Sequence, residues 1–574
     1  MSTSAVAESS PRSTAQSTLD QVVARVKESS RAFARMPIRE KRSLCEQLLE
    51  RYRQVAETTV VEACRAKGIP AGSPLAGEEW LAGPVVTLRM LRLLVESLSD
   101  VEARGAPRVE PSWVRVLPDG RLAVKVFPGN ALDAALLGKH EAEVHFQPGV
   151  TRENLFDHQA RFYRAPHEGR VCLVLGAGNV NAIPPTDCLT KLFVEGTVCV
   201  LKMNPVNAYL GPLLERAFQP LVDRGFLAVV YGGAEEGSYL AHHPLVDEVH
   251  VTGSDRTHDA LVWGAGAEGE ARRARREMLL QKPIHSELGN ITPVLVVPGP
   301  WKAQELKFQA ASVAGMVANN ASFNCNSAKL LVTAREWPDR GAFVDAVAEA
   351  LGRAPPRAAW YPGAAERWGA FVDGRNNVQR VGAAREGELP WAVLRDVDPA
   401  NLSDRVFRQE PWCSVLSETA VEGANAAAFL DAAVDFVNGS VWGTLAAMVV
   451  VSDETLKQPG VAEAFERALQ RLRYGGVAVN TWAGTLFALG TTPWGGHPST
   501  SPEDIQSGRG FVHNTLMFDG IEKVVIRAPA ANFPALPWFP GHRTAHVLGQ
   551  RLAQFEADPS WLKVPGLAAA GLRA

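Results

Sequence analysis

The sequence predicts an α/β protein: a doubly wound parallel sheet, a second α/β domain and a small β arm. Two observations support this fold class. From Arg170 onward, buried-strand patterns alternate with helical patterns on short connections, which is typical of parallel sheets covered by helices on both faces. In addition, the 574 residues are 46% hydrophobic and 21% charged, the mix of a globular chain with several domains.

The first hundred residues are expected to be largely helical. Residues 1–18 are polar and Ser-rich, which favours a disordered tail. Residues 19–36 then place large apolar side chains near one helical stripe, namely Leu19, Val22, Val23, Val26 and Phe33. Between 108 and 164 the pattern changes. Two β-type runs flank Pro118-Asp119-Gly120, which indicates a hairpin, and residues 141–149 add a short strand.

Four buried strands are predicted next. They are VCLVLGAG (171–178), TVCVLKM (197–203), FLAVVYGG (226–233) and VDEVHVTGS (246–254). Ligands bind such sheets at the carboxyl ends of their strands. We therefore expect functional residues within 176–181, 202–205, 232–233 and 253–254. The polar, Arg-rich stretch 264–278 is expected to be a solvated helix or loop.

Composition excludes several classes of function. Lys and Arg (59) nearly balance Asp and Glu (62), a formal charge of −3, so no general attraction to nucleic acid or anionic lipid is expected. No run of eighteen apolar residues predicts a membrane span. Seven scattered cysteines without a CxxC pair predict no metal site. The N-terminus lacks the pattern of a signal peptide, so a cytoplasmic enzyme is expected.

Cys325 is the first candidate for chemistry. It lies in FNCN, between two asparagines, after a helical run and before the apolar strand AKLLVT. A nucleophilic thiol needs partial exposure and polar neighbours, and this junction offers both. For an isolated cysteine, a buried structural role is the commoner alternative. Cys172, Cys188 and Cys199 fit that alternative, because they lie within apolar patterns.

Three further polar residues stand next to predicted strands. Glu287, in HSELGN, is expected in a Gly-closed turn before a buried strand, where a functional carboxylate and an ordinary surface carboxylate are equally common. Asn179 follows the first strand, where an amide can donate to a developing oxyanion. Lys202 ends the second strand, facing either a ligand or solvent. Each signal is weak alone.

In this order, the motifs resemble those of the aldehyde dehydrogenase superfamily. The resemblance rests on Asn179, Lys202, the VTGS turn (251–254), ELG (287–289), Cys325 and QEPW (409–412), followed by VNGSVWGTLAAMVV (437–450) and VAVNT…PWGG (477–496). It covers roughly residues 20–530. The ordered set is specific, although no single motif decides it.

The resemblance implies a doubly wound parallel-sheet cofactor domain, an α/β catalytic domain and a small β oligomerisation arm. The implied boundaries are 1–18 for the tail, 19–130 and 165–283 for the NAD(P)-binding domain, and 131–164 and 512–528 for the arm. They are 284–475 for the catalytic domain, 476–511 for a return segment near the active site, and 529–574 for a C-terminal extension.

The resemblance also implies a chemistry. Cys325 would attack an aldehyde, the side chain of Asn179 and the Cys325 backbone N–H would hold the oxyanion, and Glu287 would activate the hydrolytic water. The cofactor, NAD or NADP, would be bound by Lys202, Asn204, Gly253, Ser254 and Glu410. NAD-preferring members often carry a carboxylate three residues after the lysine. Because Pro205 stands there, both cofactors remain open.

Several alternatives remain open. A CoA-acylating relative, or an acyl-CoA or acyl-phosphate reductase, would use the same cysteine but commonly lacks the glutamate. A catalytically silent homologue is a third hypothesis. The chain also departs from the family pattern at six positions, namely Pro205, His258, Asn290, Phe323, Cys413 and Ser414.

The expected partners are a small-molecule aldehyde and further copies of the chain. In the family, a hairpin and a late strand add to a neighbouring subunit, so a homodimer or homotetramer is implied. The candidates here are a hairpin within about 120–165 and the strand EKVVIRA (522–528), whose exposed edge would be an aggregation liability if unpaired. Four aromatic residues are expected either to line a substrate tunnel or to fill the core, namely Phe323, Trp412, Trp482 and Phe487. The Pro-rich segment from 528 to 541 should pack on the enzyme, because its Phe533, Leu536, Trp538 and Phe539 are apolar.

Overall fold

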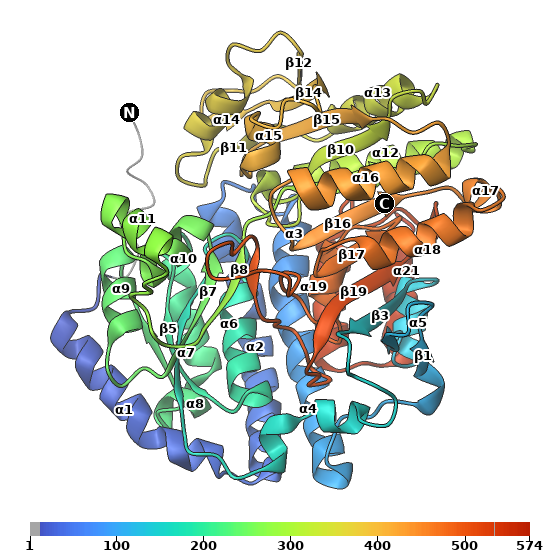
Figure 1. Cartoon of the computed structure of the whole chain (residues 1–574). Helices are drawn as coiled ribbons and strands as arrows, with labels where there is room; N and C mark the ends of the chain where they lie inside the picture. The colour runs from blue at the N-terminus through green and yellow to red at the C-terminus, as the bar shows by residue number, and fades with distance from the viewer. Residues whose placement is uncertain (1–11, 533, 574) are drawn as a thin grey trace.

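The structure is a computed structural model that describes residues 12–532 and 534–573. Two large sheets lie side by side, each flanked by helices (Figure 1). In chain order, the α-helices are α1 (Gln16–Ala34), α2 (Ile38–Ala66), α3 (Ala76–Trp80), α4 (Val86–Arg104), α5 (Ala131–Leu137), α6 (Ile183–Leu189), α7 (Gly211–Ala217), α8 (Gln219–Asp223), α9 (Ala234–His242), α10 (Asp255–Val262), α11 (Gly266–Arg275), α12 (Ala303–Ala318), α13 (Arg340–Leu351), α14 (Ala364–Val372), α15 (Arg405–Arg408), α16 (Ala426–Ser440), α17 (Asp453–Leu456), α18 (Val461–Arg471), α19 (Gly484–Leu489), α20 (Ala545–Ala557) and α21 (Val564–Gly571).

The first sheet has six strands in the described chain and confirms the predicted α/β alternation. Its order is β18 (Gly508–Arg509), β8 (Ile284–Leu288), β7 (Glu248–Gly253), β4 (Val171–Leu175), β5 (Val198–Lys202) and β6 (Leu227–Val230). All neighbours are parallel except β18 with β8. β4 and β5 are buried along their whole length, because a parallel sheet covered on both faces needs continuous apolar strands.

The second sheet has eleven strands in the described chain. Its order is β1 (Val114–Val116), β2 (Leu122–Phe127), β3 (Glu141–Phe146), β19 (Ile521–Arg527), β17 (Gly476–Val479), β16 (Ala446–Val450), β9 (Thr292–Val296), β10 (Ala328–Ala334), β15 (Val415–Val421), β14 (Trp391–Val397) and β12 (Val378–Val381). A separate pair joins β11 (Arg357–Ala358) to β13 (Glu388–Leu389). The central strands are parallel, and both ends of the sheet are antiparallel.

The arm closes onto the chain's own sheet. β19 pairs with β17 in parallel, Val524 opposite Gly476, and with β3 antiparallel, Val524 opposite Val144. The expectation that this strand has an exposed edge is therefore wrong, because both edges are hydrogen-bonded within the chain. β1 and β2 form the predicted hairpin and extend the same arm, so residues 114–127 join the arm rather than the first sheet.

The N-terminal helices begin earlier than expected. Residues 1–11 of the predicted disordered tail lie outside the described residues, but α1 already starts at Gln16, so disorder up to residue 18 is wrong. Thr14 fixes this start, because its backbone N–H donates to the Tyr231 carbonyl at 3.0 Å. The predicted apolar stripe is largely confirmed: Leu19, Val23 and Phe33 are buried.

The Pro-rich segment and α20 pack on the enzyme, as predicted. Leu536 is buried, Trp538 and Phe539 are partly buried, and Phe533 lies outside the described residues. The Phe539 ring lies 4.8 Å from that of Phe308 on α12. At Gly549 of α20, a Cβ would lie 2.6 Å from the Trp80 side chain. Such close packing makes the extension part of the folded body rather than an appendage.

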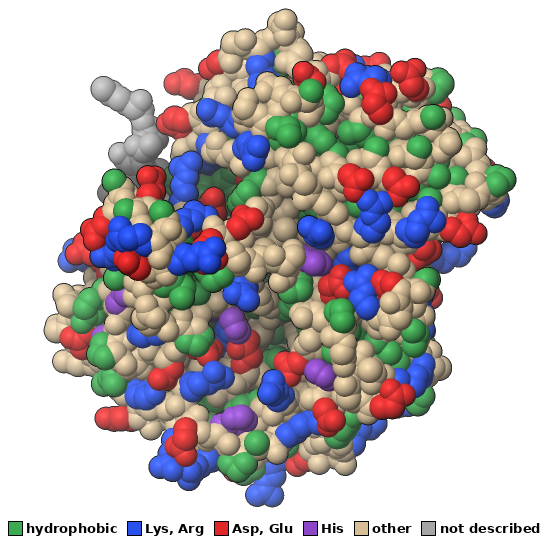
Figure 2. Space-filling view, in the orientation of Figure 1, with side chains coloured by type: hydrophobic (Ala, Val, Ile, Leu, Met, Phe, Trp, Pro, Cys, Tyr) green, Lys and Arg blue, Asp and Glu red, His purple; other side chains and the backbone are tan. Residues whose placement is uncertain are grey.

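Charged side chains of both signs are interspersed on the face shown in Figure 2, with Lys and Arg gathered over α11. The predicted solvated helix at 264–278 is thereby confirmed, since α11 buries only Gly269. All seven cysteines are unpaired. Within the described residues, no helix combines the length and hydrophobicity that a membrane crossing requires.

Candidate active site

The structure brings Cys325 and Glu287 together. Glu287 lies in β8 of the six-stranded sheet, not in the turn expected from the sequence. Cys325 lies in the loop between α12 and β10 of the eleven-stranded sheet. The Cys325 thiol donates to Glu287 Oε1 at 3.2 Å. A thiol and a buried carboxylate from different sheets therefore meet where the two sheets adjoin.

The pKa values of Glu287 and the Cys325 thiol are both raised. Burial and, to a smaller extent, the nearby Asp187 carboxylate raise the pKa of Glu287 to about 7, although the hydrogen bond from Cys325 opposes this shift. Burial and then the Glu287 charge raise the pKa of the Cys325 thiol well above its ordinary value, although Lys329 opposes this shift. The resting cysteine is thus a neutral thiol beside a carboxyl group that can accept its proton near neutral pH.

The loop before Cys325 has an unusual backbone. Asn320, Ala321 and Ser322 have φ values of 52°, 54° and 69° in the left-handed region, which costs free energy for residues other than glycine. The Asn320 side chain compensates, because its Nδ2 donates to the Asn179 carbonyl at 3.0 Å and to the Phe323 carbonyl at 3.1 Å. This strained turn fixes where the thiol points.

Asn179 reaches the same loop from the end of β4. It is 4% exposed, and its Nδ2 donates to the Phe323 carbonyl at 2.9 Å. An amide nitrogen carries two hydrogens, so one remains for a ligand two residues from the nucleophile. In the described chain, the backbone N–H of Cys325 also has no intramolecular acceptor. Two donors are thus available beside the thiol.

Two buried lysines around the loop were not predicted from the sequence. Lys67, at the end of α2, donates to Glu79 at 2.8 Å, to the Asn179 carbonyl and to Asn320 Oδ1. Lys329 donates to the carbonyls of Asn290, Asn324 and Cys325. The only sequence signal was for Lys329, a charge inside the apolar strand AKLLVT. Both lysines tie the cysteine loop to its surroundings.

The predicted cofactor residues lie at the carboxyl ends of the strands. Lys202 ends β5 and donates to the carbonyls of Gly232 and Gly233 at 3.0 and 3.2 Å. Burial lowers the pKa of Lys202, and Glu236 opposes this shift. Asn204 accepts a hydrogen bond from Val206 N–H. Gly253 ends β7, and Ser254 caps α10 by accepting from Thr257 N–H.

Glu410 lies beside the cysteine loop rather than with these strand ends. Its carboxylate is 2.7 Å from Lys329 Nζ, and a Cβ at Gly289 would collide with it. Burial raises the pKa of Glu410, whereas Lys329 opposes the shift. Steric space therefore explains the glycine of the ELG motif. Gly289 has no side chain, and this leaves room for the Glu410 carboxylate next to Glu287.

The departures from the family pattern have structural reasons. Asn290 is fully buried and donates to the Ala446 carbonyl at 2.7 Å, which links the start of β9 to β16. His258 is buried in α10. Cys413 is buried in the core, where burial raises its pKa to about 12. Asn290 thus joins two strands, whereas His258 and Cys413 fill buried positions.

Aromatic residues surround the cysteine loop in separate groups. Phe323 packs on Trp360, Tyr361 and Trp412, with ring centroids 5.0, 5.5 and 6.4 Å apart. Trp482 donates to the Asn326 carbonyl at 2.8 Å, and its ring lies 5.8 Å from Trp538 of the C-terminal extension. Phe323 and Phe487 are buried, whereas Trp412 and Trp482 are partly exposed.

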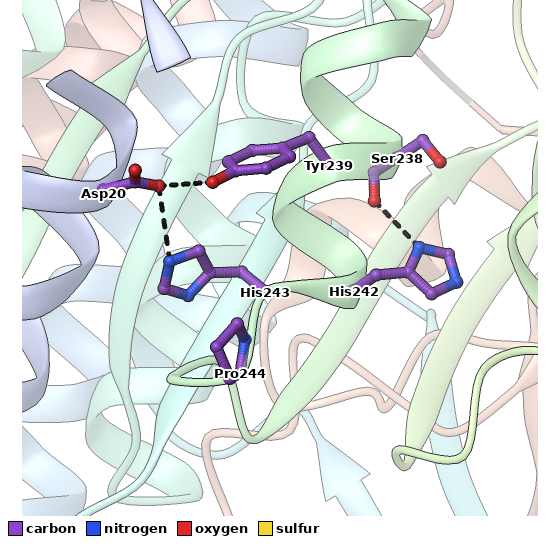
Figure 3. A pocket seen from close by; sticks show the side chains of 6 residues that line it. All are labelled: Asp20, Ser238, Tyr239, His242, His243 and Pro244. Carbon is purple, nitrogen blue, oxygen red and sulfur yellow. Dashed lines mark hydrogen bonds and ion pairs between the residues drawn. The ribbon is translucent and has the colours of Figure 1, made fainter. Parts of the chain in front are cut away.

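A depression of about 440 Å³ lies away from this chemistry, between α1 and α9 (Figure 3). Asp20 bridges Tyr239 and His243 there, and His242 bonds the Ser238 carbonyl. None of the residues that line this depression contacts the loop around Cys325. The depression is open at the surface and therefore accessible to solvent. We assign the active site by chemistry and place it at the cysteine loop.

Comparison with known proteins agrees with this geometry. The family model described as "Aldehyde dehydrogenase family" matches residues 142–387, a span that contains Asn179, Lys202, Glu287 and Cys325. Residues 142–387, somewhat under half of the chain, therefore match the aldehyde dehydrogenase family. The resemblance seen in the sequence is thereby confirmed.

Individual relatives within the superfamily are distant. N-succinylglutamate 5-semialdehyde dehydrogenase of Sphingopyxis alaskensis is 25% identical over 265 residues, 45% of this chain and 49% of that protein. The chain spans about half or less of the curated relatives it matches.

Solved structures of the superfamily share the fold. The NADP complex of NADP-dependent glyceraldehyde-3-phosphate dehydrogenase from Bacillus halodurans has a TM-score of 0.59 and 17% identity, with 90% and 92% of the two chains covered. A mutant of aldehyde dehydrogenase C from Pseudomonas syringae, in complex with NAD⁺ and octanal, has a TM-score of 0.57 and 16% identity, with 91% of each chain covered. At these identities the similarity shows the α/β fold.

Proposed function

We propose that the chain oxidises an aldehyde to a carboxylic acid with NAD or NADP, through thiohemiacetal and thioester intermediates on Cys325. The observation that carries this proposal is the 3.2 Å contact between the Cys325 thiol and Glu287. Glu287 takes the thiol proton as sulfur attacks the carbonyl carbon, because its raised pKa makes it a base near pH 7. The second N–H of Asn179 and the Cys325 backbone N–H stabilise the oxyanion.

The residues present fit a dinucleotide. Lys202 places a buried ammonium group between the ends of β5 and β6, and Asn204, Gly253 and Ser254 lie at the same edge of the sheet. Glu410 supplies a carboxylate next to the cysteine loop. When bound, NAD or NADP supplies the hydride acceptor. Pro205 provides no carboxylate against a 2′-phosphate, so the proposal includes both cofactors.

Hydrolysis of the thioester is the step that separates this function from its main alternative. Glu287 also serves as the base that activates the hydrolytic water. A CoA-acylating relative, or an acyl-CoA or acyl-phosphate reductase, transfers the acyl group to another acceptor and would lose its product to such a base. The buried contact of Glu287 with Cys325 favours the hydrolytic reaction. CoA-independent formation of reduced cofactor and acid from an aldehyde would support it.

Glu287→Gln is expected to slow the first formation of reduced cofactor, because the Cys325 thiol then loses its base. Steady turnover should slow more, by about 10²-fold or more, because hydrolysis of the thioester also needs this general base, so a burst should stay visible. In the parent enzyme, steady turnover should rise with pH through about 7 and then level off, because a base works only when ionised and Glu287 has a pKa of about 7. Stopped-flow absorbance and a pH series measure both.

Glu96→Gln is the matched control for that experiment, because this glutamate is exposed and, among the described residues, pairs only with Arg92. Its burst, rate and pH profile should equal those of the parent. An unchanged steady rate in Glu287→Gln would instead move the assignment to the acyl-transfer class.

The aromatic surroundings favour an apolar aldehyde as the substrate. Trp538 of the extension packs on Trp482, and Trp482 binds the backbone of Asn326 next to the nucleophile. We expect Trp538→Ala to change preference across straight-chain aldehydes by about tenfold in kcat/KM, because one to two buried methylene contacts are worth that much. Phe539→Ala, which loses contacts with Phe308 and Trp538 but leaves the Trp538–Trp482 contact in place, serves as the control. Equal profiles for all three enzymes would refute the role of Trp538.

A homodimer or homotetramer stays a prediction. Because β19 is paired on both edges, association would use an outer edge of the sheet, and β1 ends it with Val116 59% exposed. Such an edge can pair with a second copy. Light scattering at micromolar concentration should give a multiple of 61.9 kDa. A 61.9 kDa particle would show that the chain is a monomer.

A further inference from the structure

A column of buried polar side chains runs from Glu287 to the surface. It lies between α6, with the π-helical turn Thr190–Val194 after it, and the strands β7 and β8. Its members recur every fourth residue along the helix and every second residue along a strand, so each set shares one face. They are Asp187, Lys191 and Glu195 on the helical segment, His250 on β7, and His285 and Glu287 on β8.

At the inner end, Asp187 lies beside Glu287. Thr252, the register partner of Glu287 on β7, donates to Asp187 Oδ2 at 2.8 Å. His250 Nε2 is 3.2 Å from the same oxygen. The remaining oxygens, Asp187 Oδ1 and Glu287 Oε2, are buried and have no hydrogen-bond partner in the described chain. Two neighbouring buried acids, each with a free oxygen, are suited to share a proton.

At the outer end, the column reaches solvent. His285 is the register partner of His250. Its Nδ1 is 2.5 Å from Lys191 Nζ, and Lys191 pairs with Glu195 at 2.7 Å. The His285 side chain is 43% exposed, whereas Lys191 is 1% exposed. Lys191, followed by burial, lowers the pKa of His285 to about 4. Its imidazole is therefore neutral near pH 7, with one nitrogen to accept and one to donate.

We propose that the proton collected by Glu287 leaves along this column, through Asp187, His250 and His285, to solvent near Glu195. The inference rests on the proposed function. In hydrolysis, the water oxygen forms the new C–O bond and one water proton goes to Glu287. The C–S bond breaks with its electron pair on sulfur, and the acid gives its remaining proton to that thiolate, which leaves a carboxylate and the Cys325 thiol. The proton on Glu287 is then the one that must leave, and no oxidant or reductant is needed. Other charged groups face the route: His513 near Asp187, and Arg170 and Glu195 near His285.

Asp187→Asn tests the inner step. Asparagine keeps an oxygen for Thr252 but cannot pass on a proton. The burst of reduced cofactor should be preserved, while steady turnover and proton release to an indicator dye both fall about tenfold or more. Thr186→Val is the matched control, because Thr186 is equally buried but bonds only carbonyls of its own helix. It should behave like the parent enzyme.

His285→Gln tests the outer step and, being partly exposed, also serves if Asp187→Asn fails to fold. Steady turnover should fall with the burst intact, and added imidazole should restore part of it. Parent-like turnover and proton release in either folded variant would overturn the route, as would loss of the burst in Asp187→Asn. The proposed function would fail differently, through full activity of Cys325→Ala or Glu287→Gln.

Discussion

Cys325→Ala is expected to abolish turnover, with a loss of at least about 10⁴-fold, because the covalent intermediates form on its sulfur and catalytic nucleophiles contribute on this order. Cofactor binding and the fold should be retained, since the thiol makes a single hydrogen bond, to Glu287. Initial rates with an aldehyde, and fluorescence titration with NAD and NADP, measure the two properties.

Cys413→Ala is the control for the nucleophile. Cys413 is another thiol in the same half of the molecule, but it is buried and burial raises its pKa to about 12. Its variant should keep parent-like activity. If Cys325→Ala retained more than a few per cent of the rate while Cys413→Ala lost it, the nucleophile would have been assigned to the wrong cysteine.

Glu556→Ala should produce the largest loss of stability. Glu556 of α20 is 3% exposed and pairs with Arg89 at 3.0 Å and Arg92 at 2.6 Å. Removing one partner of a buried ion pair leaves uncompensated charge and costs about 3–5 kcal/mol. Truncation after Ala530 should destabilise the protein at least as much, because it removes the same carboxylate. Urea unfolding followed by fluorescence measures both changes.

Glu96→Ala provides the matched control, because Glu96 also pairs with Arg92 at 2.7 Å but its side chain is 54% exposed. Exposed pairs contribute about 0–1 kcal/mol, so this variant should unfold close to the parent midpoint. A truncated protein that is as stable and active as the parent would mean that the extension contributes nothing to the folded body.

The sequence predicted the features that have local signals. Alternating apolar runs located β4 to β7, and the order of short motifs, through its resemblance to the aldehyde dehydrogenase superfamily, singled out Cys325 and Glu287. The structure places them in contact. The prediction of the strands depends on patterns within a few tens of residues, and the prediction of the two residues depends on the order of motifs along the chain.

Long-range contacts were not predictable in this way. Lys67 bonds Asn320, which is 253 residues further along the chain, and nothing near Lys67 indicates that partner. The pattern of β19 predicts a strand but not which neighbours it selects, so its double pairing was missed. α21 was also missed, since VPGLAAAG combines a proline and two glycines, which are poor helix formers.

The proposed nucleophile and base come from different halves of the molecule, Cys325 from the loop before β10 of the eleven-stranded sheet and Glu287 from β8 of the six-stranded one. The distance between the Cys325 sulfur and the Glu287 carboxylate therefore depends on how the two halves of the molecule are aligned. A small rotation of one half against the other would separate sulfur from carboxylate while every strand stayed paired. The rate at which Cys325 is alkylated should consequently change under milder stress than secondary structure does, so that alkylation kinetics of this thiol report on alignment long before circular dichroism registers unfolding.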